Sequence, residues 1–154
     1  MFVKDIMNRK LIYCYENDSL YTAMKKLLKY NISGMPVIDK NKKLKGIISI
    51  TDIIDFLGKK VIKTEIKKSH FELFIFLLKN FLEENILEKA KINLQKVKVK
   101  DIMKKDVKII SEEKTIGEAI EMMRKYDISR LIVVKNSKIV GIVTKTDILK
   151  YLLK

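Results

Sequence analysis

The sequence predicts an α/β fold in which one unit, about 55 residues long, is used twice. Three blocks of residues recur in the same order along the 154-residue chain, which chance explains poorly. The spacing between matched blocks changes by one residue at a polar turn, where loops tolerate insertions and deletions. The matched blocks are residues 4–7 with 100–103, 29–33 with 125–129, and 46–53 with 141–148.

Each copy is predicted to run strand, helix, strand, strand, helix. Ser19 and Thr115 are the expected N-caps of the first helix in each copy, and Thr115 with Glu118 has the spacing of a capping box. Apolar residues then recur at helical spacing. The last helix of each copy is expected to begin near Thr51 or Thr146. The predicted strands are residues 11–14, 35–38 and 44–49 in the first copy and 107–110, 131–134 and 139–144 in the second.

The second and third strands of each copy are almost continuously apolar, as in Met35–Ile38 and Leu131–Val134. Strands with this composition are buried on both faces of a sheet. We therefore expect helices to cover both faces of each sheet.

Residues 58–98 lie between the two copies and have no counterpart in either. They contain no proline, and Ile66, Leu73 and Leu77 fall on or near one helical stripe. We expect one or two helices here, covered by the α/β units or by a second chain. The predicted division is residues 1–57 for the first repeat, 58–98 for a helical linker or insertion, and 99–154 for the second repeat.

Lysine and arginine number 33 against 19 aspartate and glutamate residues, which gives a formal net charge of +14. This excess attracts polyanions such as nucleotides, nucleic acid or an anionic membrane, and scattered surface charge that keeps the chain soluble is the alternative. The single cysteine, Cys14, excludes an internal disulfide and fits a cytoplasmic location. No stretch of about 18 apolar residues is present, so no membrane span is expected.

Candidate catalytic groups are sparse. His70 is the single histidine and has no cysteine or carboxylate cluster at ligand spacing, so neither a metal site nor a Ser–His–Asp set is expected. The chain also lacks a Walker loop and a G-x-G-x-x-G motif. The sequence therefore predicts a protein that is not an enzyme and has no catalytic cofactor.

Hydroxyls and a carboxylate gather where each copy passes from its last strand into its last helix. Free N–H groups and the helix dipole favour anions at such a position, and a carboxylate can accept hydrogen bonds from both ribose hydroxyls. An ordinary N-cap is the alternative interpretation. Recurrence in both copies favours a ligand site, although common ancestry also explains it. The two sets are Ser49, Thr51 and Asp52, and Thr144, Thr146 and Asp147.

Two further segments complete the motifs: Ile32–Val37 with Gly46, Ser49 and Asp52, and Ile128–Val133 with Gly141, Thr144 and Asp147. Together these motifs resemble the CBS domain family. The resemblance implies two CBS repeats packed through their sheets as a pseudo-twofold pair, with two clefts between them. It also implies that the clefts bind AMP, ADP, ATP, S-adenosylmethionine or a related adenosyl compound.

The resemblance further implies roles for individual residues. The two aspartates would hold ribose hydroxyls, the Ser and Thr residues beside them would contact ribose or phosphate, and Arg130 would contact phosphate. Adenine would lie against the segments before the second strands and against Tyr13 and Ile109. The implied site consists of Tyr13, Ile32, Ser33, Gly34, Met35, Pro36, Ser49, Thr51, Asp52, Ile109, Ile128, Ser129, Arg130, Leu131, Thr144, Thr146 and Asp147.

The two clefts are not expected to be equivalent. The first repeat has Gly34 and Pro36 where the second has Arg130 and Ile132. We expect one cleft to bind more tightly, and the cleft with Arg130 to be that one if the ligand is phosphorylated.

The predicted function is therefore a regulatory module that senses an adenosyl ligand and acts on a regulated protein. One alternative is a nucleic-acid-binding regulatory protein that uses the basic surface, although no recognition-helix or RNP-type signature is present. The other is a structural dimerisation module. The apolar middle segment and the resemblance both favour a homodimer.

Overall fold

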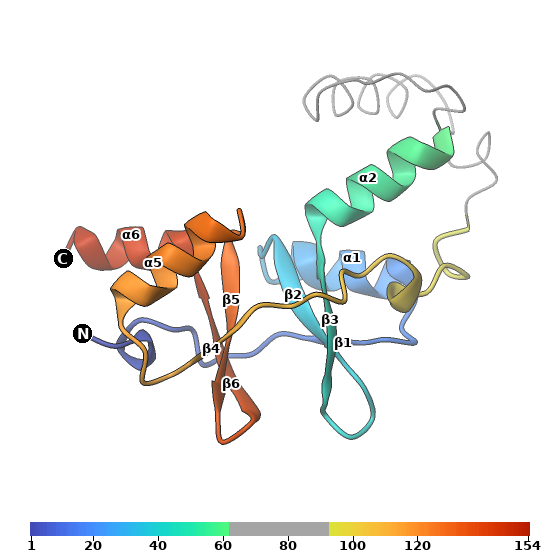
Figure 1. Cartoon of the computed structure of the whole chain (residues 1–154). Helices are drawn as coiled ribbons and strands as arrows, with labels where there is room; N and C mark the ends of the chain where they lie inside the picture. Colours follow the sequence, from blue (N-terminus) through green and yellow to red (C-terminus); the bar gives the residue numbers. More distant parts are fainter. Residues whose placement is uncertain (62–92) are drawn as a thin grey trace.

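The computed structural model describes residues 1–61 and 93–154. Within these ranges the chain forms two three-stranded sheets of the same strand order, β1-β2-β3 and β4-β5-β6, and each sheet carries two α-helices (Figure 1). The α/β fold of two β-α-β-β-α repeats is confirmed. The first repeat contains η1 (Val3–Asp5), β1 (Cys14–Tyr15), α1 (Leu20–Lys29), β2 (Gly34–Ile38), β3 (Leu44–Ser49) and α2 (Ile50–Val61). The second contains η2 (Val99–Asp101), β4 (Ile109–Ser111), α5 (Ile116–Lys125), β5 (Arg130–Lys135), β6 (Lys138–Thr144) and α6 (Lys145–Leu152).

The two sheets have the same mixed pairing. β1 pairs parallel with β2, and β2 pairs antiparallel with β3; β4, β5 and β6 repeat this arrangement. A parallel pair needs a crossover, which α1 and α5 supply. Both antiparallel pairs also shift register at matched places, between Val37 and Ile38 and between Val133 and Val134. The repetition in sequence is therefore repeated in strand register.

The first helix of each repeat begins as the sequence predicts. The Ser19 hydroxyl accepts a hydrogen bond from the Thr22 amide at the start of α1. At the start of α5, Thr115 and Glu118 form the predicted capping box, in which each side chain accepts from the other residue's amide. These bonds satisfy N–H groups that a helix leaves free in its first turn.

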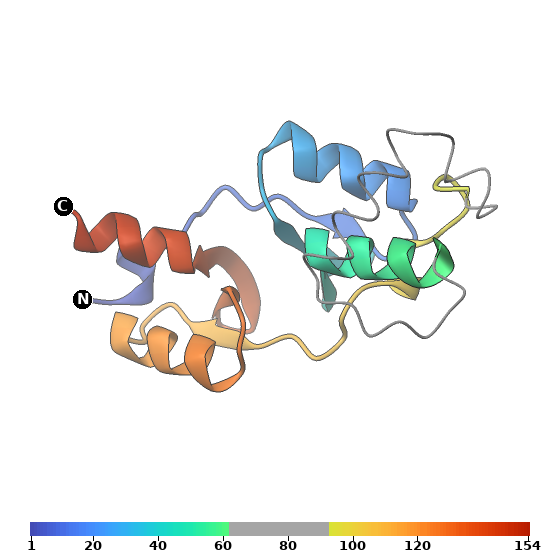
Figure 2. The ribbon, with the colours of Figure 1, turned by 90° about the horizontal axis from the view of Figure 1, so that it is seen from above.

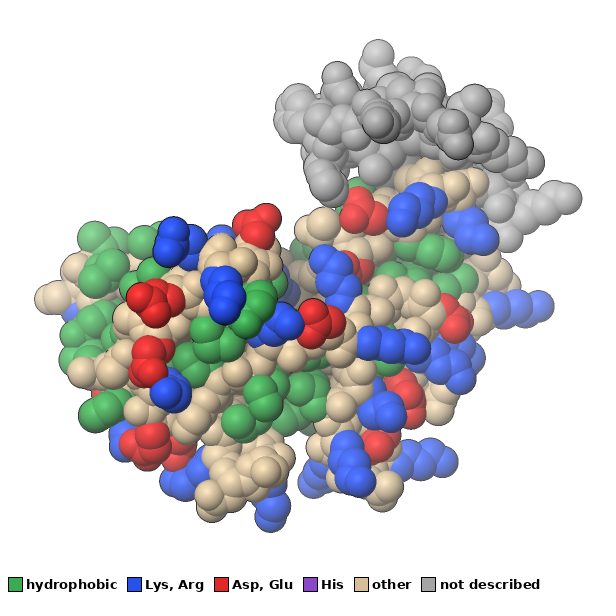
Figure 3. All heavy atoms as spheres, in the orientation of Figure 1, with side chains coloured by type: hydrophobic (Ala, Val, Ile, Leu, Met, Phe, Trp, Pro, Cys, Tyr) green, Lys and Arg blue, Asp and Glu red, His purple; other side chains and the backbone are tan. Residues whose placement is uncertain are grey.

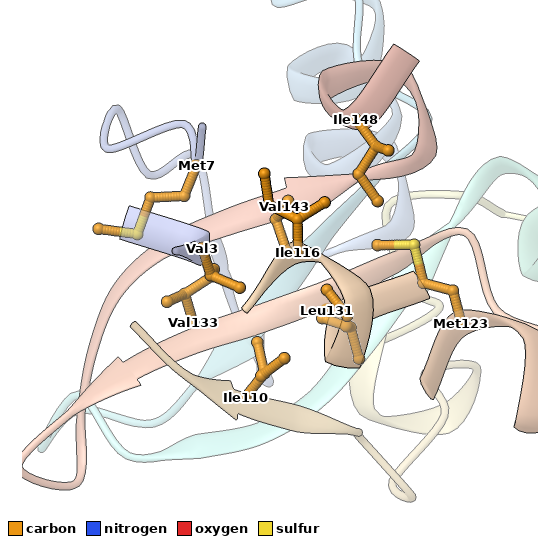
Figure 4. Packing of buried hydrophobic residues seen from close by; sticks show 10 residues of the cluster. Val3, Met7, Ile110, Ile116, Met123, Leu131, Val133, Val143 and Ile148 are labelled. Atoms are coloured by element: carbon orange, nitrogen blue, oxygen red, sulfur yellow. The ribbon is translucent and has the colours of Figure 1, made fainter. Parts of the chain in front are cut away.

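Each core takes in residues from the other repeat's sequence. Val3 and Met7 lie in the core of the second repeat, with Val133 and Val143 from its sheet (Figure 4). Val99 and Met103 lie correspondingly in the core of the first repeat. Main-chain hydrogen bonds hold the Val3 segment against the second repeat, since the Val3 amide donates to the Lys114 carbonyl. The repeats are therefore tied together by reciprocal exchange of the short segments that precede them.

The two sheets face each other, with α1 and α2 outside one and α5 and α6 outside the other (Figures 1 and 2). Met35 and Val37 pack in the helix-covered core, so Pro36 between them points to the opposite face, and it too is fully buried. Ile132 has the same position in β5 and is 0% exposed. The prediction that helices cover both faces of each sheet is therefore wrong, because the opposite repeat covers the inner face.

The predicted helical segment at residues 58–98 lies largely outside the described residues. Gly58, Lys59 and Lys60 continue α2. At the other end, Leu94 and Val97 pack against the core of the first repeat. Among the described residues, no helix is long and apolar enough to cross a membrane.

Candidate functional site

The polar clusters at the starts of α2 and α6 have one geometry. In the second repeat, Oδ2 of Asp147 accepts hydrogen bonds from the Thr144 amide at 2.9 Å and the Thr144 hydroxyl at 2.6 Å. The Asp147 amide donates back to Thr144 Oγ1 at 3.2 Å. Asp52 makes the same three bonds with Ser49, at 2.9, 2.7 and 3.3 Å. Both pairs are therefore N-terminal caps, as one interpretation of the sequence had it.

Capping uses only one oxygen of each aspartate. Oδ1 of Asp147 has no hydrogen-bond partner in the part of the chain that the structure describes. Oδ1 of Asp52 instead lies 3.4 Å from Nζ of Lys104. The sequence match places Asn8 at the position of Lys104, and Asn8 carries no charge. Asp147 thus combines a capping role with an acceptor that is open to a ligand, whereas Asp52 is ion-paired.

A cleft of about 520 Å³ lies between the repeats beside Asp147. Its volume falls in the range of sites that hold small molecules, about 300–1,000 Å³. The walls come from the start of α6, the segment before β1 and the turn between α1 and β2. The lining residues are Asn8, Lys10, Ile12, Tyr30, Asn31, Ile32, Ser33, Gly34, Ser129, Arg130, Ile142, Thr144, Lys145, Thr146, Asp147 and Lys150.

Eight residues of the predicted site meet in this cleft, and both repeats contribute to them. Those from the first repeat come immediately before or at the start of β2. Those from the second repeat come from the start of β5 and the β6–α6 junction. The eight residues are Ile32, Ser33, Gly34, Ser129, Arg130, Thr144, Thr146 and Asp147.

The other predicted residues lie elsewhere. Met35 and Leu131 are 0% exposed and lie in the two helix-covered cores, and Ile128 packs against the second of these. Tyr13 and Ile109 line a separate hollow of about 820 Å³ between the β2–β3 and β5–β6 turns. Pro36 is buried between the sheets, and Ser49, Thr51 and Asp52 belong to the first repeat's own capped junction.

Sequence reasoning missed the segment before β1. It crosses to the second repeat, where Asn8 and Ile142 exchange main-chain hydrogen bonds of 2.8 and 3.1 Å. This pairing brings Lys10 and Ile12 to the cleft. Lys104 and Ile47 exchange the matching bonds, both 2.9 Å, on the other side. Nothing in the local sequence pattern indicates the exchange, because the residues involved are far apart along the chain.

Lysines of α6 were also missed, although their positions could have been found. Lys145 and Lys150 line the cleft from the first two turns of that helix. They follow directly from placing a ligand at Asp147, two and three residues away in sequence. Tyr30 lines the cleft as well, and Nζ of Lys10 lies 5.8 Å from the centre of its ring.

Arg130 reaches across the boundary between the repeats. Its Nη2 donates a hydrogen bond to Ser33 Oγ at 2.8 Å. Its Nη1 is buried and has no hydrogen-bond partner among the described residues. Burial lowers the pKa of Arg130, and the negative charge of Asp52 acts in the opposite direction. Arginine still keeps its charge, so a cationic donor without an acceptor lies at this boundary.

The space for this guanidinium exists because residue 34 has no side chain. A Cβ on Gly34 would overlap Nη1 of Arg130 and would lie 3.1 Å from the Ile48 carbonyl oxygen. The expectation that the two clefts differ rests on Gly34 and Arg130, and the structure shows that the absence of a side chain at one position makes room for the long side chain at the other.

Charged side chains of both signs are scattered among apolar and other residues on the face of the molecule shown in Figure 3. Lysine and arginine are interspersed there with aspartate and glutamate over both repeats. A nucleic-acid surface normally has a continuous basic patch or stripe. On this face, therefore, the distribution of charge does not favour the nucleic-acid alternative.

Comparison with known proteins gives matches along the whole chain. The CBS domain family matches residues 3–59 and 99–154. The uncharacterized protein MJ1426 of Methanocaldococcus jannaschii is 37% identical over 160 residues, which covers 99% of this chain and 92% of that protein.

Two solved structures share the fold and 27% of the sequence. One is the CBS domain pair of protein MJ0100 in complex with 5′-methylthioadenosine and S-adenosyl-L-methionine, with a TM-score of 0.68 over 99% of this chain and 95% of that one. The other is the CBS domain of a CBS domain-containing membrane protein from Sphaerobacter thermophilus, with a TM-score of 0.70 over 97% of this chain and 86% of that one.

Proposed function

This chain belongs to the CBS domain family, and we propose that it is a regulatory module that binds an adenosyl compound in the cleft beside Asp147. The observation that carries the proposal is the open Oδ1 of Asp147, an anionic acceptor that faces no hydrogen-bond partner within residues 1–61 and 93–154. The vicinal hydroxyls of a ribose supply two donors to such a carboxylate. The capping bonds to Thr144 hold the carboxylate in place before a ligand arrives.

The rest of the cleft suits the other parts of an adenosyl compound. Ile12, Ile32 and Ile142 offer an apolar wall for a purine, and Tyr30 offers an aromatic one. Thr146 lies at the start of α6 with Asp147 and provides a further hydroxyl. The relative MJ0100, whose domain pair was solved with 5′-methylthioadenosine and S-adenosyl-L-methionine, supports the same ligand class. AMP, ADP and ATP carry the same adenosyl group and are candidates too.

The position of the cleft suits regulation. Ser33 and Gly34 come from one repeat and Thr146 and Asp147 from the other, so a bound ligand would contact both. A ligand shifts an equilibrium only if it binds one arrangement more tightly than another. A ligand that bridges the repeats meets this condition, because its affinity depends on their relative position. A regulated protein would then respond to the arrangement that the ligand favours.

Isothermal titration calorimetry with adenosine, AMP, ATP, 5′-methylthioadenosine and S-adenosylmethionine tests the proposal. We expect at least one of these to bind, and Asp147→Ala to weaken it by about tenfold or more, the cost of losing hydrogen bonds to a charged group. Asp52→Ala is the matched control, because it removes the same kind of cap from α2 but lies outside the cleft. Asp147→Asn adds a variant that keeps the shape of the side chain.

Thermal melting of each variant separates loss of the ligand from loss of the fold. The proposal fails if none of the five compounds binds the wild-type protein. It also fails if Asp147→Ala and Asp147→Asn are folded and bind with wild-type affinity.

A further inference from the structure

The matched sides of the two repeats differ in charge. The lysines of the Asp147 cleft are Lys10, Lys145 and Lys150. The sequence repeat matches them with Asp106, Ile50 and Asp55 on the Asp52 side. The match holds in three dimensions, because the Asn8–Ile142 pairing is repeated by Lys104–Ile47. At every one of these three positions a cation is replaced by an anion or by an apolar residue.

The cations of the Asp147 cleft also lack ion-paired carboxylates among the described residues. Within the described ranges, Lys10, Lys145 and Lys150 form no ion pair. Arg130 lines the same cleft, and its buried Nη1 has no acceptor there. Among the described residues that line this cleft, four are therefore cationic and one, Asp147, is acidic.

The lysines on the Asp52 side, in contrast, already have acidic partners. Nζ of Lys104 lies 3.4 Å from Asp52. Nζ of Lys108 lies 2.8 Å from Asp106 and 4.5 Å from the centre of the Tyr126 ring. A second anion on this side would have to compete with carboxylates that are part of the chain.

We propose that the Asp147 cleft selects an adenosyl ligand that carries phosphate, a nucleotide, over neutral or cationic adenosyl compounds. This inference rests on the proposed function and specifies the charge of its ligand. A cluster of like charges at a cleft raises the local concentration of an oppositely charged ligand, and the guanidinium supplies directed donors for phosphate oxygens. Asp147 holds the ribose, and the phosphates extend toward Arg130 and the α6 lysines.

Calorimetry at two salt concentrations tests the proposal, with adenosine, S-adenosylmethionine, AMP and ATP as probes. We expect AMP and ATP to bind wild-type protein at least about tenfold more tightly than adenosine or S-adenosylmethionine, the effect of roughly one charge-assisted contact. Raising NaCl from about 50 to about 300 mM should weaken AMP and ATP binding several-fold and change adenosine binding little, since salt screens exposed charges.

The double variant Lys145→Met, Lys150→Met should remove most of the preference for nucleotides, so that AMP and ATP lose far more affinity than adenosine does. The matched control is Lys25→Met, Lys45→Met, which removes the same net charge from exposed lysines outside the cleft. This control should keep the preference.

Three results would overturn the inference. Adenosine or S-adenosylmethionine could bind as tightly as AMP and ATP, the α6 double variant could keep the nucleotide preference, or the control pair could lose as much of it. In each case adenosyl binding that depends on Asp147 would leave the proposed function standing. Absence of binding by every probe would instead overturn both.

Discussion

The guanidinium of Arg130 occupies the space that a side chain on residue 34 would need. Arg130 donates to Ser33 Oγ at 2.8 Å, and a Cβ on Gly34 would overlap its Nη1. The sequence match places these two residues at the same position in their repeats. The same position therefore holds an arginine side chain in the second repeat and no side chain in the first. The boundary between the repeats has room for one long side chain at this point.

Gly34→Ala should therefore displace the Arg130 guanidinium and break its bond to Ser33. The far end of an arginine can move, so we expect a modest loss of stability, about 1–3 kcal/mol, together with weaker nucleotide binding. In an Arg130→Ala background the same substitution should cost less, because the overlap is gone. Urea unfolding of the four proteins in this double-mutant cycle measures the coupling.

Gly117→Ala is the control for this cycle. Gly117 lies in α5, and its Cβ would meet nothing closer than Thr115 Oγ1 at 3.8 Å. It should stabilise the protein by about 0.5–1 kcal/mol, the usual difference between glycine and alanine in a helix. Strictly additive effects of Gly34→Ala and Arg130→Ala would contradict the proposed packing.

The reciprocal exchange of segments predicts that Val3→Ala loosens the second repeat and Val99→Ala the first. Both side chains are 0% exposed, so each truncation should cost about 1.5–3 kcal/mol. Hydrogen–deuterium exchange followed by mass spectrometry reads out the location. Val3→Ala should raise exchange first in residues 110–148, and Val99→Ala first in residues 14–53.

The reciprocal exchange of segments would be contradicted if each substitution raised hydrogen–deuterium exchange first in the repeat that follows it directly in sequence. A uniform increase over both repeats in both variants would also contradict it, since the two cores would then not be separate clusters.

The sequence predicts the fold well because its main signals are local. Apolar strands and a capping box such as Thr115–Glu118 are specified by residues close in sequence. The repetition then matches each element of one copy with its counterpart in the other. The strand β3 was predicted with its observed bounds, Leu44–Ser49. Contacts between repeats have no such signal. The crossing of Asn8 to Ile142 joins residues 134 positions apart, and no periodicity marks it.

The site was predicted in part for the same reason. The motif at Thr144–Asp147 lies within four residues, and the cleft does form beside it. The resemblance implies that Tyr13 lies against adenine; in the structure Ile12 lines the cleft beside Asp147, and Tyr13 lines the separate hollow. Adjacent residues in an extended segment point to opposite sides, so a shift of one position changes which side chain lies at the cleft. Which side chains of the segment before β1 face the cleft is determined by the pairing of this segment with the second repeat.

Cys14 should be unreactive in the folded protein. It is 0% exposed, and burial raises the pKa of its thiol to about 12. The thiolate is the species that attacks disulfide reagents, so at about pH 8 almost none is present. We expect negligible release of chromophore from Ellman's reagent by native protein and one equivalent, from this single cysteine, in urea. Rapid reaction of the native protein would show that Cys14 is accessible.

Glu118 should make stability depend on acidity. Its hydrogen bond with Lys114, followed by those from the Thr115 amide and hydroxyl, lowers the pKa of Glu118 from 4.5 to about 2. A carboxyl with a lowered pKa stabilises the fold above its unfolded value, and this contribution disappears as the pH falls from 4.5 toward 2. Glu118→Gln should therefore be less stable than wild type at about pH 6, with a difference that shrinks toward pH 2.

Urea midpoints over this pH series test the capping role, with Glu121→Gln as the control on the same helix. Glu121 is exposed and lies outside the capping box, so its substitution should change the midpoints little. A difference between Glu118→Gln and wild type that stays constant over the whole range would contradict the linkage.

A crystal structure of the protein with AMP tests the central claim most directly, because it locates the ligand. The account predicts AMP in the cleft between the repeats, with its ribose hydroxyls on Oδ1 of Asp147. Its phosphate should lie toward Arg130, Lys145 and Lys150. AMP bound in the hollow at Tyr13 and Ile109, or with its ribose away from Asp147, would contradict the account.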